Sequence, residues 1–382
     1  MIINRFKLLK GILYFIIISY VLSVSRFSIV ELNNKLYFLK HAAIFIPAVI
    51  IWFEWGFLKN LNLGKENQLF VILLILIFIP FFYRGFFNLS EFVIFFQIVL
   101  FLFSCIFFAR YIEEIFGTFK KSDFYFLLGI FLIPLLLNVI FEEGDFIYNT
   151  YYGRPRLLLG YFHPKEGAIC LLTVIIFYHL IFSKYYSTRA SFFYILFFLL
   201  ILYFMQSRNI LIYYLNFLFL QKVLKKISIK VILFGYFVLP FVVISLLIYL
   251  FYEEINILMS NRLDWWFKNF SITAFGGGSS IADYSKSNVF SKLHFDNYYL
   301  EYLVENGVFF FLILLIFLYK VCLEIAKYKI GSVYLNAFFI SFLFFCIFDA
   351  GMFSSGNLLN FLAWIIVFAF LFNRRNLFET LQ

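Results

Sequence analysis

Twelve apolar runs follow one another along the chain, and they constrain its fold more than any other feature. A run of about 20 apolar residues is long enough to cross the hydrocarbon core of a membrane as a helix. Because 64% of the 382 residues are hydrophobic and 25% are aromatic, the chain lacks the polar residues that a water-soluble domain needs for its surface. We therefore expect an all-α, polytopic integral membrane protein with about 12 transmembrane helices, in which residues 1–382 form a single integral membrane domain. The runs lie near residues 9–25, 38–57, 68–87, 90–109, 123–141, 166–183, 190–206, 210–221, 229–251, 299–319, 333–349 and 357–372.

The positions of Lys and Arg predict the orientation of these helices, since short cytoplasmic loops are enriched in both. If the N-terminus is cytoplasmic, the inside segments hold 19 of the 31 basic residues. Both termini are then cytoplasmic, and the two long polar loops, 142–165 and 253–297, are external. The second of these lies between helices 9 and 10. The net charge of +10 is thus a signal of topology and does not indicate nucleic-acid binding.

The first apolar run and the four cysteines indicate neither a cleaved signal peptide nor a disulfide framework. The first run follows three basic residues but precedes no cleavage-site pattern, so we expect a retained helix. Cys105, Cys170, Cys322 and Cys346 all lie in apolar runs without metal-ligand or disulfide spacing, and packing is their expected role. Trp364, in the last apolar run, is expected to belong to an interfacial aromatic belt.

The first external loop contains two arginines and a histidine within YYGRPRLLLGYFHPKEGA, residues 151–168. Arg154 and Arg156 flank Pro155, whose fixed φ favours an extended backbone, so both guanidinium groups could converge on one anion. The guanidinium fork suits a phosphate better than the ammonium of Lys does. Alternatively, both arginines only mark an outer loop. His163 is a further candidate, or forms a turn with Pro164 before a helix that starts near Glu166.

Arg208, in the segment MQSRN, is a third arginine of interest. It lies 14 residues before Lys222, which is about 21 Å of helix, whereas the hydrocarbon core is about 30 Å thick. We therefore expect Arg208 below the outer surface, facing a cavity or a partner. The alternative is a snorkelling residue at the end of an under-length helix pair.

The large loop holds the remaining candidates. Arg262 could bind an anion or instead pair with Asp264 or a nearby Glu, and Trp265 and Trp266 could stack on sugar rings or lie at the lipid interface. The glycines 276–278 lack the GK[ST] of a phosphate loop and predict a pliable segment.

His294, Asp296 and Asn297 stand directly before the tenth apolar run. They could move protons or bind sugar hydroxyls. Alternatively, Asp296 or Asn297 is the N-cap of the following helix. Neither has Glu or Gln three residues later to complete a capping box.

Taken in order, these motifs resemble the superfamily of O-antigen polymerases and O-antigen ligases. The resemblance comprises RxRxxxGxxxHP before the sixth run, Ser-Arg between the seventh and eighth, Arg followed by Trp in the large loop, and HxDNxYLxxLxxxG into the tenth run. It covers most of residues 153–307. Two positions depart from the pattern. Lys165 follows the HP where many relatives have Asn, and Asp296 stands where ligases commonly have His.

The resemblance implies a metal-independent membrane glycosyltransferase in the bacterial cytoplasmic (inner) membrane, without a cofactor. It would polymerise undecaprenyl-pyrophosphate-linked oligosaccharide repeat units into O-antigen, capsular or exopolysaccharide chains on the outer face. Arg154, Arg156, Arg208 and Arg262 would hold the pyrophosphate, with Arg262 also assisting catalysis. His294 or Asp296 would act as the base, while His163, Asn297, Trp265 and Trp266 would bind substrate.

Two alternatives remain. An O-antigen ligase would transfer the glycan to lipid A core or protein, but the Asp-Asn form before the tenth run favours a polymerase. A flippase for the same lipid-linked oligosaccharide would carry polar residues through several helices and show internal repeats, and we find no repeat. The expected partners are membrane lipids, a chain-length regulator and a flippase.

Overall fold

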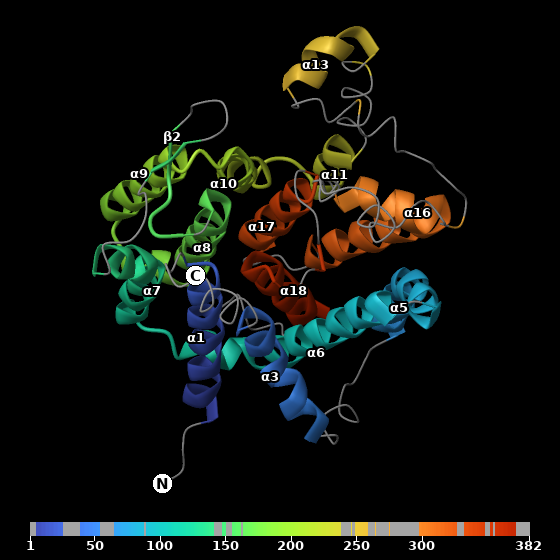
Figure 1. The fold of residues 1–382 in the computed structure, drawn as a ribbon, viewed down its shortest axis with the longest axis horizontal. Helices are drawn as coiled ribbons and strands as arrows, with labels where there is room; N and C mark the ends of the chain where they lie inside the picture. Colours follow the sequence, from blue (N-terminus) through green and yellow to red (C-terminus); the bar gives the residue numbers. More distant parts are fainter. Residues whose placement is uncertain are drawn as a thin grey trace.

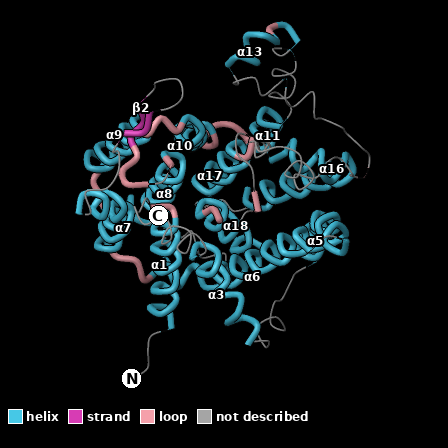
Figure 2. The backbone as a smooth tube through the Cα atoms, in the orientation of Figure 1, coloured by secondary structure: helices cyan, strands magenta, loops and turns pink. Residues whose placement is uncertain are grey.

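The fold is nearly all helical in this computed structural model (Figure 1). The structure describes residues 5–25, 39–53, 65–87, 89–140, 147–149, 155–161, 163–237, 246, 249–258, 264, 275, 298–326, 332–347, 352–353 and 356–371. Each of the twelve apolar runs contains a helix within these residues. A two-stranded antiparallel hairpin is the sheet of the described part, and one of its strands is drawn in magenta in Figure 2.

The helices and strands are, in chain order, α1 (Arg5–Ser23), α3 (Leu39–Phe53), α5 (Lys65–Phe87), α6 (Leu89–Gly117), α7 (Lys121–Ile140), β1 (Ile147–Asn149), β2 (Pro155–Leu157), α8 (Pro164–Phe177), α9 (Thr188–Phe204), α10 (Arg208–Val223), α11 (Ile229–Phe237), α13 (Tyr252–Leu258), α16 (Tyr298–Ala326), α17 (Ser332–Phe345) and α18 (Leu358–Leu371). A π-helical turn, η1 (Tyr178–Phe182), and a 3₁₀ turn, η2 (Ser183–Tyr185), continue α8.

Five helical segments of the described chain are long and apolar enough to cross a membrane: residues 6–23, 92–112, 121–140, 164–185 and 298–326. Four shorter apolar helices accompany them, at residues 68–83, 188–204, 333–345 and 358–369. The predicted helical, membrane-spanning class is confirmed to this extent.

Several helices turn apolar faces outward. The exposed large side chains of α9 include Phe192, Phe193, Phe197 and Phe204. A water-soluble monomer does not display contiguous apolar surface of this extent, because water would penalise it. Contact with lipid tails is the environment that fits such a face.

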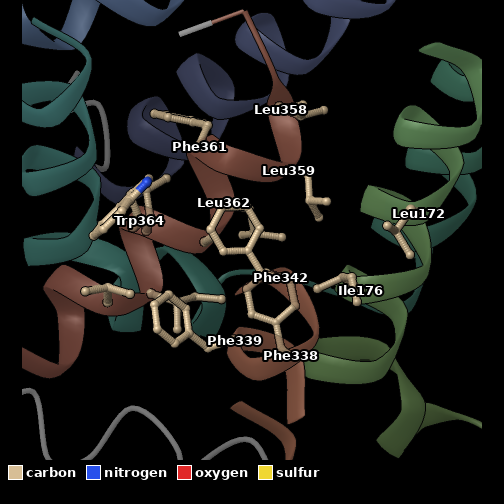
Figure 3. Packing of buried hydrophobic residues seen from close by; sticks show 14 of the residues in the cluster. Leu172, Ile176, Phe338, Phe339, Phe342, Leu358, Leu359, Phe361, Leu362 and Trp364 are labelled. Carbon is tan, nitrogen blue, oxygen red and sulfur yellow. The ribbon is translucent and has the colours of Figure 1, made fainter. Parts of the chain in front are cut away.

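Part of the core lies between α8, α17 and α18 (Figure 3), and the same cluster of buried residues continues into other helices such as α1, α6 and α10. Leu172 and Ile176 of α8 face the aromatic side chains of α17 and α18, including Phe342. Within the candidate span that contains α8, 83% of the residues are buried, a larger share than in the other four candidates. Helix α8 is therefore the most deeply buried of the five candidate spans. The segments that adjoin it are anchored through α8 to the core.

The expectation that Trp364 belongs to an interfacial aromatic belt is wrong. Its side chain is fully buried on α18, where it stacks on Phe353 with 4.7 Å between ring centroids. Its indole Nε1–H donates to the carbonyl of Met352 at 3.0 Å. The apolar run did not reveal this burial, because it depends on partners from the preceding loop. The four cysteines are buried and free, as expected for packing residues.

Helices α1, α7 and α8 form a group with two distinct ends. At one end Lys10 of α1 meets Asp123 of α7, and at the other Tyr20 of α1 meets Glu166 of α8. Helices α1 and α7 therefore run in one direction and α8 runs back between these ends. We call them the Lys10 end, with Lys10, Tyr14, Thr118 and Asp123, and the Arg156 end, with Tyr20, Arg156, His163 and Glu166.

Candidate functional site

The segment that carries Arg156 is fixed to its surroundings by a hairpin and a tight turn. Strands β1 and β2 pair antiparallel, with Tyr148 opposite Arg156. The chain then turns through Leu159 (φ 53°) and Gly160 (φ 78°). A Cβ on Gly160 would lie 2.1 Å from the carbonyl oxygen of Pro134 in α7. Only glycine therefore allows this turn to approach α7 so closely.

Tyr161 completes the attachment of this turn. Its hydroxyl donates to the carbonyl of Phe131 at 2.8 Å, and its ring stacks on that of Phe131. Its backbone also pairs with Ser25, just after α1. The loop between β2 and α8 is thus bound to both α1 and α7.

His163 is the N-cap of α8. It has extended φ/ψ of −139° and 141°, and its Nδ1 accepts the backbone N–H of Lys165 at 3.2 Å. Pro164 occupies the first helical position, where its missing N–H has no cost. The predicted turn before α8 is confirmed, and the helix begins at Pro164, two residues before Glu166.

Partial burial favours the neutral form of His163. Partial desolvation lowers the pKa of His163, and the positive charges of Arg156 and Lys165 lower it further, while Glu166 opposes them. A neutral ring whose Nδ1 accepts a hydrogen bond carries its proton on Nε2. His163 is therefore a hydrogen-bond donor through Nε2 and is not poised as a base at its other nitrogen.

Arg156 lies near His163 with part of its guanidinium unsatisfied. The side chain is half-buried, and its Nε is buried without a hydrogen-bond partner. A buried unsatisfied donor on a charged group costs about 1–3 kcal/mol or more. Such a donor is available to an anionic ligand that can enter the site.

Arg208 is the first residue of α10, and its side chain is exposed. The junction before it includes Gln206, which has a positive φ of 47°. Two side chains pack against Gly167 of α8, that of Met205 from this junction and that of Tyr161. A Cβ on Gly167 would lie 2.5 Å from Met205 Cε and 2.7 Å from the Tyr161 ring. The α9–α10 junction and the His163 turn therefore meet over the first turn of α8, near β2 in Figure 1.

The structure thus brings together the elements that carry three predicted residues, Arg156, His163 and Arg208. The other predicted site residues lie outside the described residues: Arg154, Arg262, Trp265, Trp266, His294, Asp296 and Asn297. Asp264, the proposed alternative partner of Arg262, accepts hydrogen bonds from the Tyr252 hydroxyl at 2.6 Å and from the Asn256 amide.

Two residues of the site, Tyr20 and Glu166, were not predicted from the sequence to belong to it. Glu166 accepts a hydrogen bond from the Tyr20 hydroxyl at 3.0 Å, which joins α1 to the first turn of α8. An acidic residue in a first helical turn is a weak signal that could have drawn attention to Glu166. No local signal could have identified Tyr20, because it is 146 positions away in the chain.

The described residues contain no group of three or more His, Cys, Asp or Glu that could hold a metal ion. Comparison with protein-family models, curated proteins and solved structures found no match to this chain.

Proposed function

We propose that the chain is a metal-independent glycosyltransferase that polymerises undecaprenyl-pyrophosphate-linked repeat units on the outer face of the bacterial cytoplasmic membrane. The observation that carries the proposal is the unsatisfied Arg156 Nε at the start of α8. Its positive charge acts on His163, the N-cap of α8. A guanidinium donor of this kind suits an oxygen of a pyrophosphate.

The reaction needs stabilisation of a leaving group. A hydroxyl oxygen of one lipid-linked repeat attacks the anomeric carbon of another chain, and the bond from that carbon to the pyrophosphate oxygen breaks. Undecaprenyl pyrophosphate leaves with the electron pair, and the hydroxyl proton passes to a base. Arginines arranged around the developing negative charge stabilise the transition state without a metal. We assign this role to Arg154, Arg156, Arg208 and Arg262.

The base is assigned to His294, with Asp296 as the second candidate, because the unperturbed pKa of His is near neutrality. His163 is assigned to binding, since its Nδ1 is occupied by the backbone of Lys165. Trp265, Trp266 and Asn297 would line the groove that holds the acceptor sugars.

The proposal includes the finer topology of twelve spans, cytoplasmic termini and external loops at 142–165 and 253–297. The Lys10 end, which would be cytoplasmic, carries Lys10, Lys120, Lys121 and Lys184 near the ends of α1, α7 and α8. This agrees with the enrichment of basic residues in cytoplasmic loops. Labelling of single cysteines at Lys226 and Ser279 with an impermeant reagent tests it. Reaction of residue 226 but not residue 279 from outside would contradict the topology.

Transport of the same lipid-linked oligosaccharide is the second candidate function. The observation that favours it is the interruption of α16 at Gly307, since broken membrane helices often form the binding sites of transporters. Ligation is distinguished from polymerisation by the acceptor alone.

The purified protein with one lipid-linked repeat as its only substrate tests the proposal. We expect a ladder of products that forms without added divalent metal and persists in EDTA. His294→Ala and Asp296→Ala should abolish or slow it. Transfer that appears only when a different acceptor is supplied would favour a ligase, and movement of the substrate across a vesicle membrane without a new glycosidic bond would favour a transporter.

A further inference from the structure

Lysines gather in one short turn of the protein, between α10 and α11. Lys222, Lys225, Lys226 and Lys230 lie within nine residues of each other in the chain, and all four side chains are exposed. In the part of the chain that the structure describes, none of the four forms an ion pair. We call residues 222–230 the lysine turn.

The sequence around the lysine turn offers it no counter-charge. Residues 167–252 contain seven Lys or Arg and no Asp or Glu. Enrichment of basic residues in a short loop is by itself only a signal of topology. Because the neighbouring chain supplies no carboxylate, however, the positive charge of this turn is not neutralised locally.

Hydrogen bonds fix the backbone of the lysine turn. Helix α10 ends at Val223, whose carbonyl accepts the N–H groups of Lys226 and Ile227, each at 2.9 Å. The carbonyl of Ser228 accepts the N–H of Val231 at 3.1 Å, so α11 begins directly after the turn. The lysines are therefore carried by an ordered backbone.

Helices α10 and α11 form a hairpin with the lysine turn at its tip. The Tyr236 hydroxyl of α11 donates to Oδ1 of Asn216 in α10. The Asn216 amide donates to Ser341 Oγ of α17 at 3.3 Å. Residues 216 and 236 stand at similar distances in the chain from the turn, so α11 returns alongside α10. The hairpin is thus anchored to α17.

The lysine turn lies at the end of α10 that is remote from Arg156. The α9–α10 junction meets the first turn of α8 where Met205 packs against Gly167. Further along both helices, Nε2 of His179 lies 3.1 Å from the hydroxyl oxygen of Tyr214. Helices α8 and α10 therefore run in the same direction, and α10 ends on the side opposite the candidate site.

An exposed apolar row on α10 leads to the lysine turn. Ile212, Leu215 and Phe219 are exposed, whereas Phe217 is buried. Spacings of three and four residues place the exposed side chains on one side of the helix, and Lys222 continues their row. A row of apolar side chains that ends in a cation matches a phospholipid, whose acyl chains lie below its headgroup.

The start of α11 repeats this pattern. Ile227, Val231 and Phe234 are exposed at spacings of four and three residues, and Lys230 is next to Val231 in the chain. An acidic soluble partner would cover the lysines but would leave the apolar rows in water, which is unfavourable. A lipid covers both the charges and the apolar side chains.

We propose that the lysine turn binds the headgroups of anionic phospholipids, while the exposed apolar residues of α10 and α11 contact their acyl chains. A cluster of lysines at the end of a membrane helix attracts anionic lipids. Zwitterionic lipids lack the net negative charge that this attraction requires. The inference is independent of the proposed glycosyl transfer, and its test measures lipid contact, not activity.

The test identifies the lipids that contact α10. The full chain, with photoreactive p-benzoylphenylalanine in place of Phe219, is reconstituted into bilayers of phosphatidylcholine with a minor share of phosphatidylglycerol, both with the same acyl chains. After irradiation, mass spectrometry of the adducts gives the ratio of phosphatidylglycerol to phosphatidylcholine at the probe. We expect this ratio to exceed that of the bulk mixture about fivefold or more, the effect of one lysine near an anionic membrane surface.

Two controls separate the lysine turn from the rest of the surface. A probe in place of Phe96, an exposed residue of α6 with no Lys or Arg within ten positions, should report the bulk ratio. The double variant Lys222→Gln/Lys226→Gln should lower the enrichment at position 219 about fivefold. Lys7→Gln, at an exposed lysine of α1, should retain it.

Salt provides an arm that needs no substitution in the lysine turn. At about 1 M salt the Debye length is about 3 Å, so the enrichment at position 219 should fall toward the bulk ratio. This arm decides the outcome if the double variant does not fold.

The bulk ratio at position 219, with all lysines present, would overturn the proposal. So would equal enrichment at positions 219 and 96, or enrichment that neither the double variant nor high salt reduces. Adducts between two copies of the chain at position 219, in place of lipid adducts, would assign this face to self-association and would also overturn it.

Discussion

The two ends of the α1–α7–α8 group use charge in opposite ways. At the Lys10 end, Lys10 Nζ lies 2.7 Å from Asp123 Oδ2 and donates to the Thr118 carbonyl at 3.2 Å. The Tyr14 hydroxyl donates to the other carboxylate oxygen, Asp123 Oδ1, at 2.7 Å. At the Arg156 end, the Arg156 Nε is buried without a partner. The first end satisfies its charges internally and holds helices together, whereas the second leaves one guanidinium donor unsatisfied.

The largest expected effect on stability comes from a variant that separates the turn at the Arg156 end from α7 and leaves the Lys10 end intact. Gly160→Ala places a Cβ 2.1 Å from the carbonyl oxygen of Pro134, at a φ of 78°. We expect a loss of about 3 kcal/mol in the free energy of unfolding, from overpacking and left-handed strain together. Thermal unfolding of the purified protein measures it.

Gly129→Ala is the control for that prediction, because its added Cβ meets nothing within 4 Å on α7. It should leave the stability unchanged or raise it slightly, since Ala favours a helix more than Gly does. Equal melting temperatures for Gly160→Ala and wild type would show that the turn does not need its close contact with α7.

Arg156→Lys should reduce polymerisation about a hundredfold, because a lost donor to developing charge commonly costs that much. Lysine keeps the positive charge but lacks the guanidinium fork. Initial rates of ladder formation measure the effect. Arg189→Lys, at an exposed position beside the Lys10 end, is the matched control and should retain the wild-type rate. Similar rates for both variants would remove Arg156 from the site.

Asp123→Asn should lower the stability by about 2 kcal/mol, because it leaves Lys10 in a largely buried position without its charged partner. The double variant Lys10→Met/Asp123→Asn should recover part of the loss, since no unpaired charge then remains. Urea or thermal unfolding measures both. Glu254→Gln, an exposed residue of α13, should have no effect. A double variant that is no more stable than Asp123→Asn alone would contradict this effect of the unpaired charge.

The smallest effect concerns pH at the His163 cap. The folded-state pKa of His163 is lowered, so the unfolded chain binds the proton more readily. The stability from this residue is therefore present above the unfolded pKa of about 6.5 and is lost as pH falls below it. The loss should amount to about 1 kcal/mol, the usual contribution of an N-cap.

His163→Asn supplies a cap that does not titrate, so it serves as the comparison for that effect. The difference in melting temperature between wild type and His163→Asn should change between pH 7 and pH 5. A difference that is constant over this range would contradict the assigned protonation of His163.

Much of the helical framework could be predicted from the sequence, because long apolar runs specify helices by composition alone. The hairpin of β1 and β2, the interruption of α16 at Gly307 and the burial of Trp364 could not. The close approach of the turn after β2 and the burial of Trp364 depend on contacts outside their own elements, Gly160 with Pro134 and Trp364 with Met352. Periodicity within one helix carries no information about such contacts.

The candidate site was predictable in part for the same reason. Polar residues in an apolar chain, such as Arg156, His163 and Arg208, are conspicuous in the sequence. The sequence did not reveal that Met205 and Tyr161 contact the same glycine of α8, or that Tyr20 bonds to Glu166. These contacts place the α9–α10 junction and the His163 turn at one end of α8.

The central claim is that the Arg156 end receives a lipid-linked pyrophosphate and the Lys10 end does not. Direct binding of undecaprenyl pyrophosphate to the purified chain, measured at fixed salt, tests it for wild type, Arg156→Lys and Arg189→Lys. We expect Arg156→Lys to weaken binding about tenfold, as loss of a charge-assisted fork to phosphate would. Arg189→Lys should bind as wild type does. Equal affinities for all three proteins, or a weaker affinity for Arg189→Lys than for Arg156→Lys, would contradict the account.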